Sequence, residues 1–273
     1  AGYSNNQGGG STAGAVAGRI QDNQIIANGG VGLTHHNGGT VSGNRVRSNR
    51  LPLSVNAAAI GAVTAQNIDS LLGNTGDTLV VECCSGEEVV ASDTVRTRPE
   101  LPWRIDVGLR FINRTVWKLQ PGSSIFLNSG GRIQIGQNPP CDPSTQGAVL
   151  RAESDNTTAI RFTSRNQTRG AWSQILLECL SDTTKLSNVE VRYAGAGGED
   201  AIRIAPGTAG VPVILDSVRV LHSGSRGVLI QNAAKVIVQR HLAADSNNAE
   251  GLKVEARDVS IPKGSFRANG GPA

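Results

Sequence analysis

Short runs of alternating apolar and polar residues recur along the chain at a nearly constant spacing. The N-terminal part shows this most clearly, because Asn23 is followed by Asn44, and Asn28 by Asn49, each 21 residues later. A weaker third copy covers residues 63–68. A period of 20–22 residues, with short strands separated by turns, predicts the coils of a parallel β-helix solenoid.

The repeated asparagines suit the corners of such coils. Asparagine tolerates the left-handed backbone conformation that a sharp corner requires, and its side-chain amide can bond to the same residue in the next coil. Glycine pairs such as Gly29-Gly30 allow the same turns without a Cβ atom. We therefore expect Asn23 to stack on Asn44, and Asn28 on Asn49.

The C-terminal half continues the pattern with less asparagine. Strands of three to five residues are expected in the segments 186–193, 201–204, 215–220, 227–230, 234–238, 252–254 and 259–261. No stretch has the periodicity of a helix of three turns. A β-sandwich is the structural alternative, but it would need longer strands joined by hairpin turns. The sequence therefore predicts an all-β fold and favours the β-helix over the sandwich.

Composition suggests how the chain is divided. Residues 1–18 are rich in Gly, Asn and Ser and are expected to form a flexible lead-in, while 19–273 form one continuous β-helix domain. Residues 75–115 are expected to be a less regular insertion, because Pro99 and Pro102 interrupt the rhythm. The absence of methionine indicates a processed mature form or an excised fragment.

Charge and hydropathy narrow the classes of partner. The net charge is +4, but the basic residues are dispersed among acidic ones and form no run, so nucleic acid is not an expected partner. No apolar run is long enough to span a bilayer, so no transmembrane segment is expected. A mildly basic surface instead favours an acidic polysaccharide or an anionic cell surface.

The four cysteines, Cys83, Cys84, Cys141 and Cys179, lack the spacing of a metal site. In an oxidising compartment they allow three pairings. Adjacent strand residues point to opposite faces, so Cys83 and Cys84 would bond to different partners or stay unbridged. The alternative is that the cysteines are buried free thiols. Neither a metal nor another cofactor is expected.

The segment 116–195 resembles a known superfamily. Its motifs are L-Q-P-G-S-S-I (119–125), I-R-F-T-S (160–164), G-A-W-S-Q-I (170–175) and L-S-N-V-E-V-R-Y-A-G (186–195). Their order is similar to that of right-handed parallel β-helix repeat proteins of bacterial envelopes. The resemblance implies a right-handed solenoid that is secreted or exposed on the cell surface. It leaves the chemistry open, because the superfamily includes lyases, hydrolases, adhesins and proteins without known activity.

No complete catalytic signature occurs, so the chain is expected to be non-catalytic. Weak candidates are Arg192, Arg203, Glu199 and Asp200, which would meet Glu190 on one face if their strands stack in successive coils. The alternative for these residues is a ladder of charged side chains across neighbouring strands.

The leading hypothesis is a β-helix that serves as a structural scaffold, an adhesive module or a self-assembling subunit, with association through its open ends. The alternative is a carbohydrate-active enzyme or a glycan-binding module for acidic polysaccharides. A glycan-binding module would need exposed aromatic platforms, for which Trp103 and Trp117 are the candidates; the alternative is that both are packed in the core.

Overall fold

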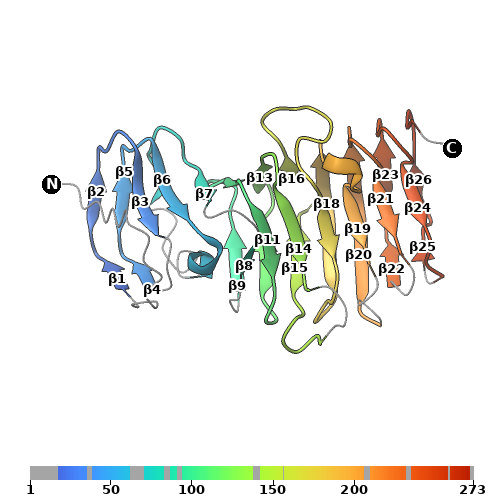
Figure 1. Cartoon of the computed structure of the whole chain (residues 1–273), viewed down its shortest axis with the longest axis horizontal. Helices are drawn as coiled ribbons and strands as arrows, with labels where there is room; N and C mark the ends of the chain where they lie inside the picture. The colour runs from blue at the N-terminus through green and yellow to red at the C-terminus, as the bar shows by residue number, and fades with distance from the viewer. Residues whose placement is uncertain are drawn as a thin grey trace.

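The computed structural model describes residues 18–35, 39–61, 71–82, 87–90, 94–137, 142–155, 157–205, 210–231, 235–257 and 259–270. Within these residues the protein is all-β, and helix is limited to short segments such as η1 (Ala57–Ala59) and η3 (Ala196–Gly198). The strands lie side by side along the long axis of an elongated molecule, with β1 and β2 at one end and β24 to β26 at the other (Figure 1). The expected lead-in lies outside the described residues, except for Gly18, which begins β1.

The named strands pair only in parallel, and all except the two N-terminal pairs β1–β4 and β2–β5 fall into three columns. The first column contains β3 (Val31–His35), β6 (Leu51–Val55), β7 (Leu79–Val81), β10 (Trp103–Ile105), β13 (Ser124–Leu127), β16 (Ile160–Thr163), β23 (Leu242–Asp245) and β26 (Gly264–Ser265). The second contains β8 (Glu87–Val90), β11 (Gly108–Phe111), β14 (Arg132–Ile135), β17 (Ile175–Leu177), β19 (Ile202–Ile204), β21 (Val228–Ile230) and β24 (Leu252–Val254). The third contains β9 (Thr94–Thr97), β12 (Val116–Leu119), β15 (Val149–Glu153), β22 (Lys235–Val238) and β25 (Val259–Ser260).

Two long strands, β18 (Thr184–Arg192) and β20 (Pro212–Leu221), belong to two columns at once. Their first halves continue the third column and their second halves continue the first. At the N-terminal end, β1 (Gly18–Gln21) pairs with β4 (Gly39–Ser42), and β2 (Gln24–Ile26) pairs with β5 (Arg45–Arg47). From β7 to β15 each strand pairs with the strand three places further along the chain, and β16, β17 and β18 pair with the strand two places further, because β18 and β20 each serve two columns.

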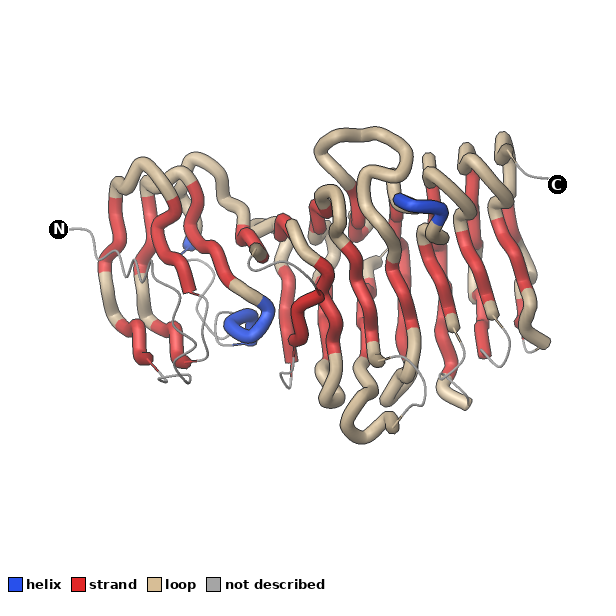
Figure 2. Tube along the Cα trace, viewed as in Figure 1, coloured by secondary structure: helices blue, strands red, loops and turns tan. Residues whose placement is uncertain are grey.

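The spacing between paired residues is less constant than the sequence predicts. It is 21 residues from Ile20 to Val41, which agrees with the expected 20–22. It rises to 37 from Ile125 to Phe162 and to 29 from Phe162 to Val191. Where the structure describes them, the additional residues form loops that project from the ends of the strands (Figure 2). Loops can lengthen in this way because they lie outside the sheets and leave the strand register unchanged.

The segment 75–115 contains strands that are paired on both sides. In the first column, β7 pairs with β6 and with β10. In the second, β11 pairs with β8 and with β14. The local irregularity near the two prolines is an isolated antiparallel bridge between Arg98 and Leu101.

The expected asparagine stacking is confirmed. The Asn23 side-chain amide donates to the Asn44 Oδ1 atom at 2.9 Å, and the Asn28 amide donates to the Asn49 Oδ1 atom at 3.0 Å. Asn49 in turn donates to the Asn74 Oδ1 atom at 3.0 Å. Asn74 is thus the third member of this ladder, whereas the weaker copy expected at 63–68 lies outside the described residues.

The core is one continuous cluster of buried apolar side chains, with an aromatic group in the middle. The Trp117 ring stacks on Phe111, with 4.7 Å between centroids, and lies 5.8 Å from the Trp103 ring. Both tryptophans are buried, with exposed fractions of 0% for Trp117 and 2% for Trp103. Of the two alternatives for Trp103 and Trp117, exposed platforms for glycans or packed core residues, the structure shows the packed one. Their size places them in the core, where they fill the space between the sheets.

Candidate functional site

The residues expected to converge on one catalytic face are divided among separate contacts. Arg192 ends β18, Glu199 and Asp200 lie in the loop after η3, and Arg203 lies on β19. Arg203 donates to the Gln231 Oε1 atom at 3.0 Å. The structure thus separates Arg203 from the Arg192 contact, because the two arginines belong to different columns.

Arg192 belongs to a group of charged side chains that we name the Glu190 cluster (Glu190, Arg161, Arg192 and Arg219). Glu190 is 6% exposed and faces Arg192 Nε at 2.7 Å, Arg219 at 3.4 Å and Arg161 at 3.7 Å. Hydrogen bonding to Glu190 raises the pKa of the Arg192 guanidinium. Arg161, Glu190 and Arg219 are register partners on successive strands. This arrangement is the cross-strand ladder considered as the alternative to catalysis.

The Glu199–Asp200 pair also consists of two separately bound carboxylates. Asp200 is 3% exposed, and its Oδ1 atom accepts from Arg226 Nε at 2.6 Å. Donating this hydrogen bond to the Asp200 carboxylate raises the pKa of Arg226. Glu199 is half-buried and accepts from the Gln174 amide at 2.8 Å. Each carboxylate therefore already has a donor, and neither is placed as the free acid of an acid–base pair.

Sequence reasoning missed a second polar group on the outer face of the second column, which we name the Glu178 cluster (Glu178, Gln134, Arg110, Arg132 and Arg203). Glu178 is 7% exposed and accepts from the Gln134 amide at 3.0 Å. Burial raises the pKa of Glu178, while the three arginines oppose that change. Glu178 follows the apolar run 175–177, so the sequence suggested only a buried strand. The partners become apparent only from the register of β11, β14, β17 and β19.

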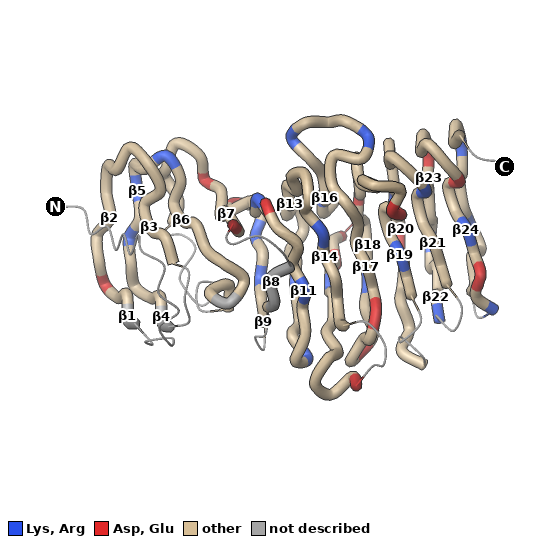
Figure 3. The backbone as a smooth tube through the Cα atoms, in the orientation of Figure 1, with Lys and Arg blue, Asp and Glu red and all other residues tan. Residues whose placement is uncertain are grey.

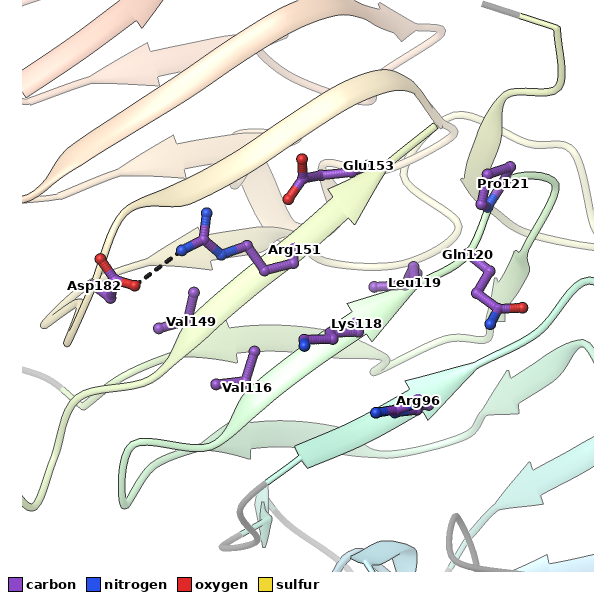
Figure 4. A pocket seen from close by; sticks show the side chains of 10 residues that line it. All are labelled: Arg96, Val116, Lys118, Leu119, Gln120, Pro121, Val149, Arg151, Glu153 and Asp182. Carbon is purple, nitrogen blue, oxygen red and sulfur yellow. Dashed lines mark hydrogen bonds and ion pairs between the residues drawn. The ribbon is translucent and has the colours of Figure 1, made fainter. Parts of the chain in front are cut away.

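An open groove lies over the third column, on the outer face of β9, β12 and β15 (Figure 4). Its volume is about 650 Å³. Strand register places Arg96 beside Lys118, Lys118 beside Arg151, and Arg151 beside Lys185. We name these four residues the cation row. Their side chains share one face because each occupies the same outward position of its strand.

The cation row is only partly neutralised. Arg151 pairs with Asp182 at 2.9 Å, and Lys185 pairs with Glu153 at 3.1 Å. Arg96 and Lys118 are exposed and make no ion pair with any residue that the structure describes. Elsewhere basic and acidic residues are interspersed along the molecule (Figure 3). The groove therefore holds an excess of positive charge.

Apolar and amide side chains border the cation row. Val116 and Val149 are register partners along one side of it. Gln120 and Pro121 line the groove just beyond the end of β12. The groove can therefore offer cations, hydrogen-bonding groups and the partly exposed Val116 side chain to one extended ligand.

Cys179 is disulfide-bonded and fully buried, so a free thiol at this position is excluded. Cys83, Cys84 and Cys141 lie outside the described residues.

Among the residues that are described, no group of three or more His, Cys, Asp or Glu side chains is arranged to hold a metal ion. The same residues include no helix with the length and apolar character needed to cross a bilayer. No family model, curated protein sequence or solved structure matches the chain.

Proposed function

We propose that the chain is a right-handed parallel β-helix solenoid that acts as a non-catalytic scaffold and adhesive module on the cell surface. The solenoid is supported by the pairing of strands three places apart and by the asparagine ladders. A right-handed path is the expected hand for parallel strands joined by crossovers. The three columns would then be the three faces of a coil.

The pairing of carboxylates with cations is the observation that carries the non-catalytic assignment. Glu190, Asp200 and Asp216 are each 3–7% exposed and each contacts an arginine. General acid–base cleavage of a glycan needs two carboxylates that face the same bond. Carboxylates held in cross-strand ion pairs instead neutralise the outer faces of the sheets.

The disulfide at Cys179 supports location outside the cytoplasm. Structural disulfides persist in oxidising compartments and are rare where glutathione keeps thiols reduced. A fully buried, disulfide-bonded cysteine therefore suits a secreted or surface-exposed protein.

A turnover assay tests the non-catalytic assignment. The purified chain would be incubated with acidic and neutral polysaccharides, and the solutions read for the ultraviolet absorbance of unsaturated uronates and for new reducing ends. We expect neither signal, together with attachment of the labelled chain to intact cells. Product formation that is lost in Arg203→Ala or Asp200→Asn, with the fold intact, would overturn the assignment in favour of the carbohydrate-active enzyme.

Self-association is a second candidate because the exposed large apolar side chains lie on the outermost described strands. Ile26 on β2 is 48% exposed, Val254 on β24 is 42% exposed, and Phe266 beside β26 is 39% exposed. Strands at the edge of a sheet can pair with another chain. Sedimentation velocity over a range of concentrations should show oligomers that Val254→Lys reduces. A monomer at every concentration contradicts this candidate.

A further inference from the structure

The cation row points to the ligand of the adhesive module. We propose that Arg96, Lys118 and Arg151, which line the groove of Figure 4, bind a linear acidic polysaccharide whose chain runs across the strands and reaches Lys185, the register partner of Arg151. This inference rests on the proposed function, since it names the class of molecule to which the module adheres.

The spacing of the row favours a ligand with regularly repeated charges. Neighbouring strands lie about 4.8 Å apart, so the four cations span about 14 Å in a straight line. A linear polymer with a carboxylate or a sulfate on each sugar can place several anions along such a line. A single small anion would engage only part of the row.

Two members of the row are available for a ligand without breaking an existing pair. Arg96 and Lys118 are exposed and make no ion pair with a described residue. Asp182 and Glu153 have exposed fractions of 67% and 44%, so their pairs with Arg151 and Lys185 are largely solvated. Such pairs are weak and can exchange with a ligand anion at little cost. Lys118 is unpaired among the described residues and lies between Arg96 and Arg151, so it is the principal contact for the ligand.

The borders of the groove suit a sugar chain better than a nucleic acid. The partly exposed Val116 side chain offers an apolar contact to the C–H face of a sugar ring, and the exposed Gln120 amide can bond to hydroxyls. Proteins that bind single-stranded nucleic acids stack the bases on aromatic side chains. The residues that line this groove include no aromatic side chain.

Binding of defined oligomers tests the inference. Calorimetry would compare oligogalacturonate with its methyl-esterified form and with neutral dextran of similar length, while dextran sulfate of similar length distinguishes sulfates from carboxylates. Lys118→Glu should weaken binding of the charged oligomer by about tenfold or more, because it replaces an attraction with a repulsion. Lys235→Glu is the matched control, since Lys235 is an exposed cation of the same column outside the groove. It should leave binding unchanged.

The salt dependence of binding and a charge-neutral variant of Lys118 give independent readouts. Raising the ionic strength from about 0.1 M to about 1 M shortens the screening length from about 10 Å to about 3 Å, so binding should weaken strongly. Lys118→Gln, which removes the charge without adding another, guards against misfolding of the glutamate variant.

Three results would overturn the inference: equal binding by the Lys118 variants and the wild type, equal binding of the esterified oligomer, or displacement of the polysaccharide by a DNA oligonucleotide at a similar concentration. Cell attachment that persists alongside any of these results would leave the proposed function standing. Turnover of the oligomer would instead contradict the proposed function.

Discussion

Asn28 and Asn49 are joined twice, because both the backbone N–H and the side-chain amide of Asn28 donate to the Asn49 Oδ1 atom, at 2.9 and 3.0 Å. Each asparagine follows a residue with positive φ, 60° at Ala27 and 56° at Ser48. The side-chain amide thus satisfies a corner where the backbone leaves the sheet pattern. Repetition of this contact from Asn28 through Asn49 to Asn74 ties successive corners together.

Asn49→Ala should destabilise the N-terminal repeats. Asn49 is fully buried and donates to the Ile25 and Arg47 carbonyl groups as well as to Asn74. Its loss leaves several buried groups without partners, at about 1–3 kcal/mol for each one that water cannot reach. Faster hydrogen exchange of the β2 and β5 amides measures the effect. Asn28→Ala, at a half-buried position, should cost about 1 kcal/mol or less; an equal effect of both variants would contradict the role of burial.

Gly136→Ala should be far more damaging than Gly130→Ala. Both glycines have positive φ, 85° and 86°, so each substitution carries the backbone cost of about 1–2 kcal/mol. At Gly136 a Cβ atom would also collide with the carbonyl oxygens of Glu178 and Cys179, whereas nothing lies within 4 Å at Gly130. Urea unfolding of the two variants measures the difference. Equal losses of unfolding free energy would show that the close approach of the two strand ends is not maintained in solution.

Glu178→Gln should stabilise the protein, relative to the wild type, at neutral and higher pH. Burial raises the pKa of Glu178 above its ordinary value of 4.5, so the folded state binds this proton more tightly than the unfolded state. The wild type therefore loses unfolding free energy as the pH rises from 4.5 through the folded pKa. Each tenfold difference in proton affinity corresponds to about 1.4 kcal/mol. Thermal unfolding should show the advantage of the variant vanishing below pH 4.5; an advantage independent of pH would contradict the linkage.

Asp216→Asn should destabilise the protein at neutral pH and have no effect in strong acid. Hydrogen bonding from Arg240, at 2.8 Å to the Oδ2 atom, lowers the pKa of Asp216 below its ordinary value of 3.8. Its stabilisation is thus fully present above 3.8 and is lost as the pH falls through the folded pKa. We expect a loss of about 1–2 kcal/mol at pH 7, reduced because Arg240 is partly solvated.

Asp182→Asn is the control for that experiment. Asp182 also pairs with an arginine, but its side chain is 67% exposed. Its substitution should change the unfolding free energy by less than about 1 kcal/mol. A loss at Asp182 as large as the loss at Asp216 would mean that burial does not decide the strength of these pairs.

Part of the candidate chemistry was accessible from residue types alone. The alternation of Glu190 and Arg192 indicated an outward-facing charged strand, and the contact between the two confirms it. Glu178 and Gln134 are 44 residues apart, and no pattern in the sequence connects them. Their contact depends on β14 and β17 being neighbours, and a repeat of irregular length separates these strands.

The sequence by itself determined the all-β character, the short strands and the stacking of Asn23 on Asn44 and of Asn28 on Asn49. These features can be read from short segments of sequence, because each strand alternates apolar and polar residues and each sharp turn of the backbone uses asparagine or glycine. Only the tertiary structure decided which outward residues become neighbours. Lys118 lies beside Arg96, 22 residues before it, and beside Arg151, 33 residues after it. Loops outside the sheets can lengthen without altering the strand register. Because the loop lengths vary, the spacing of the four cations in the sequence is irregular, and the cation row could not be predicted from the sequence alone.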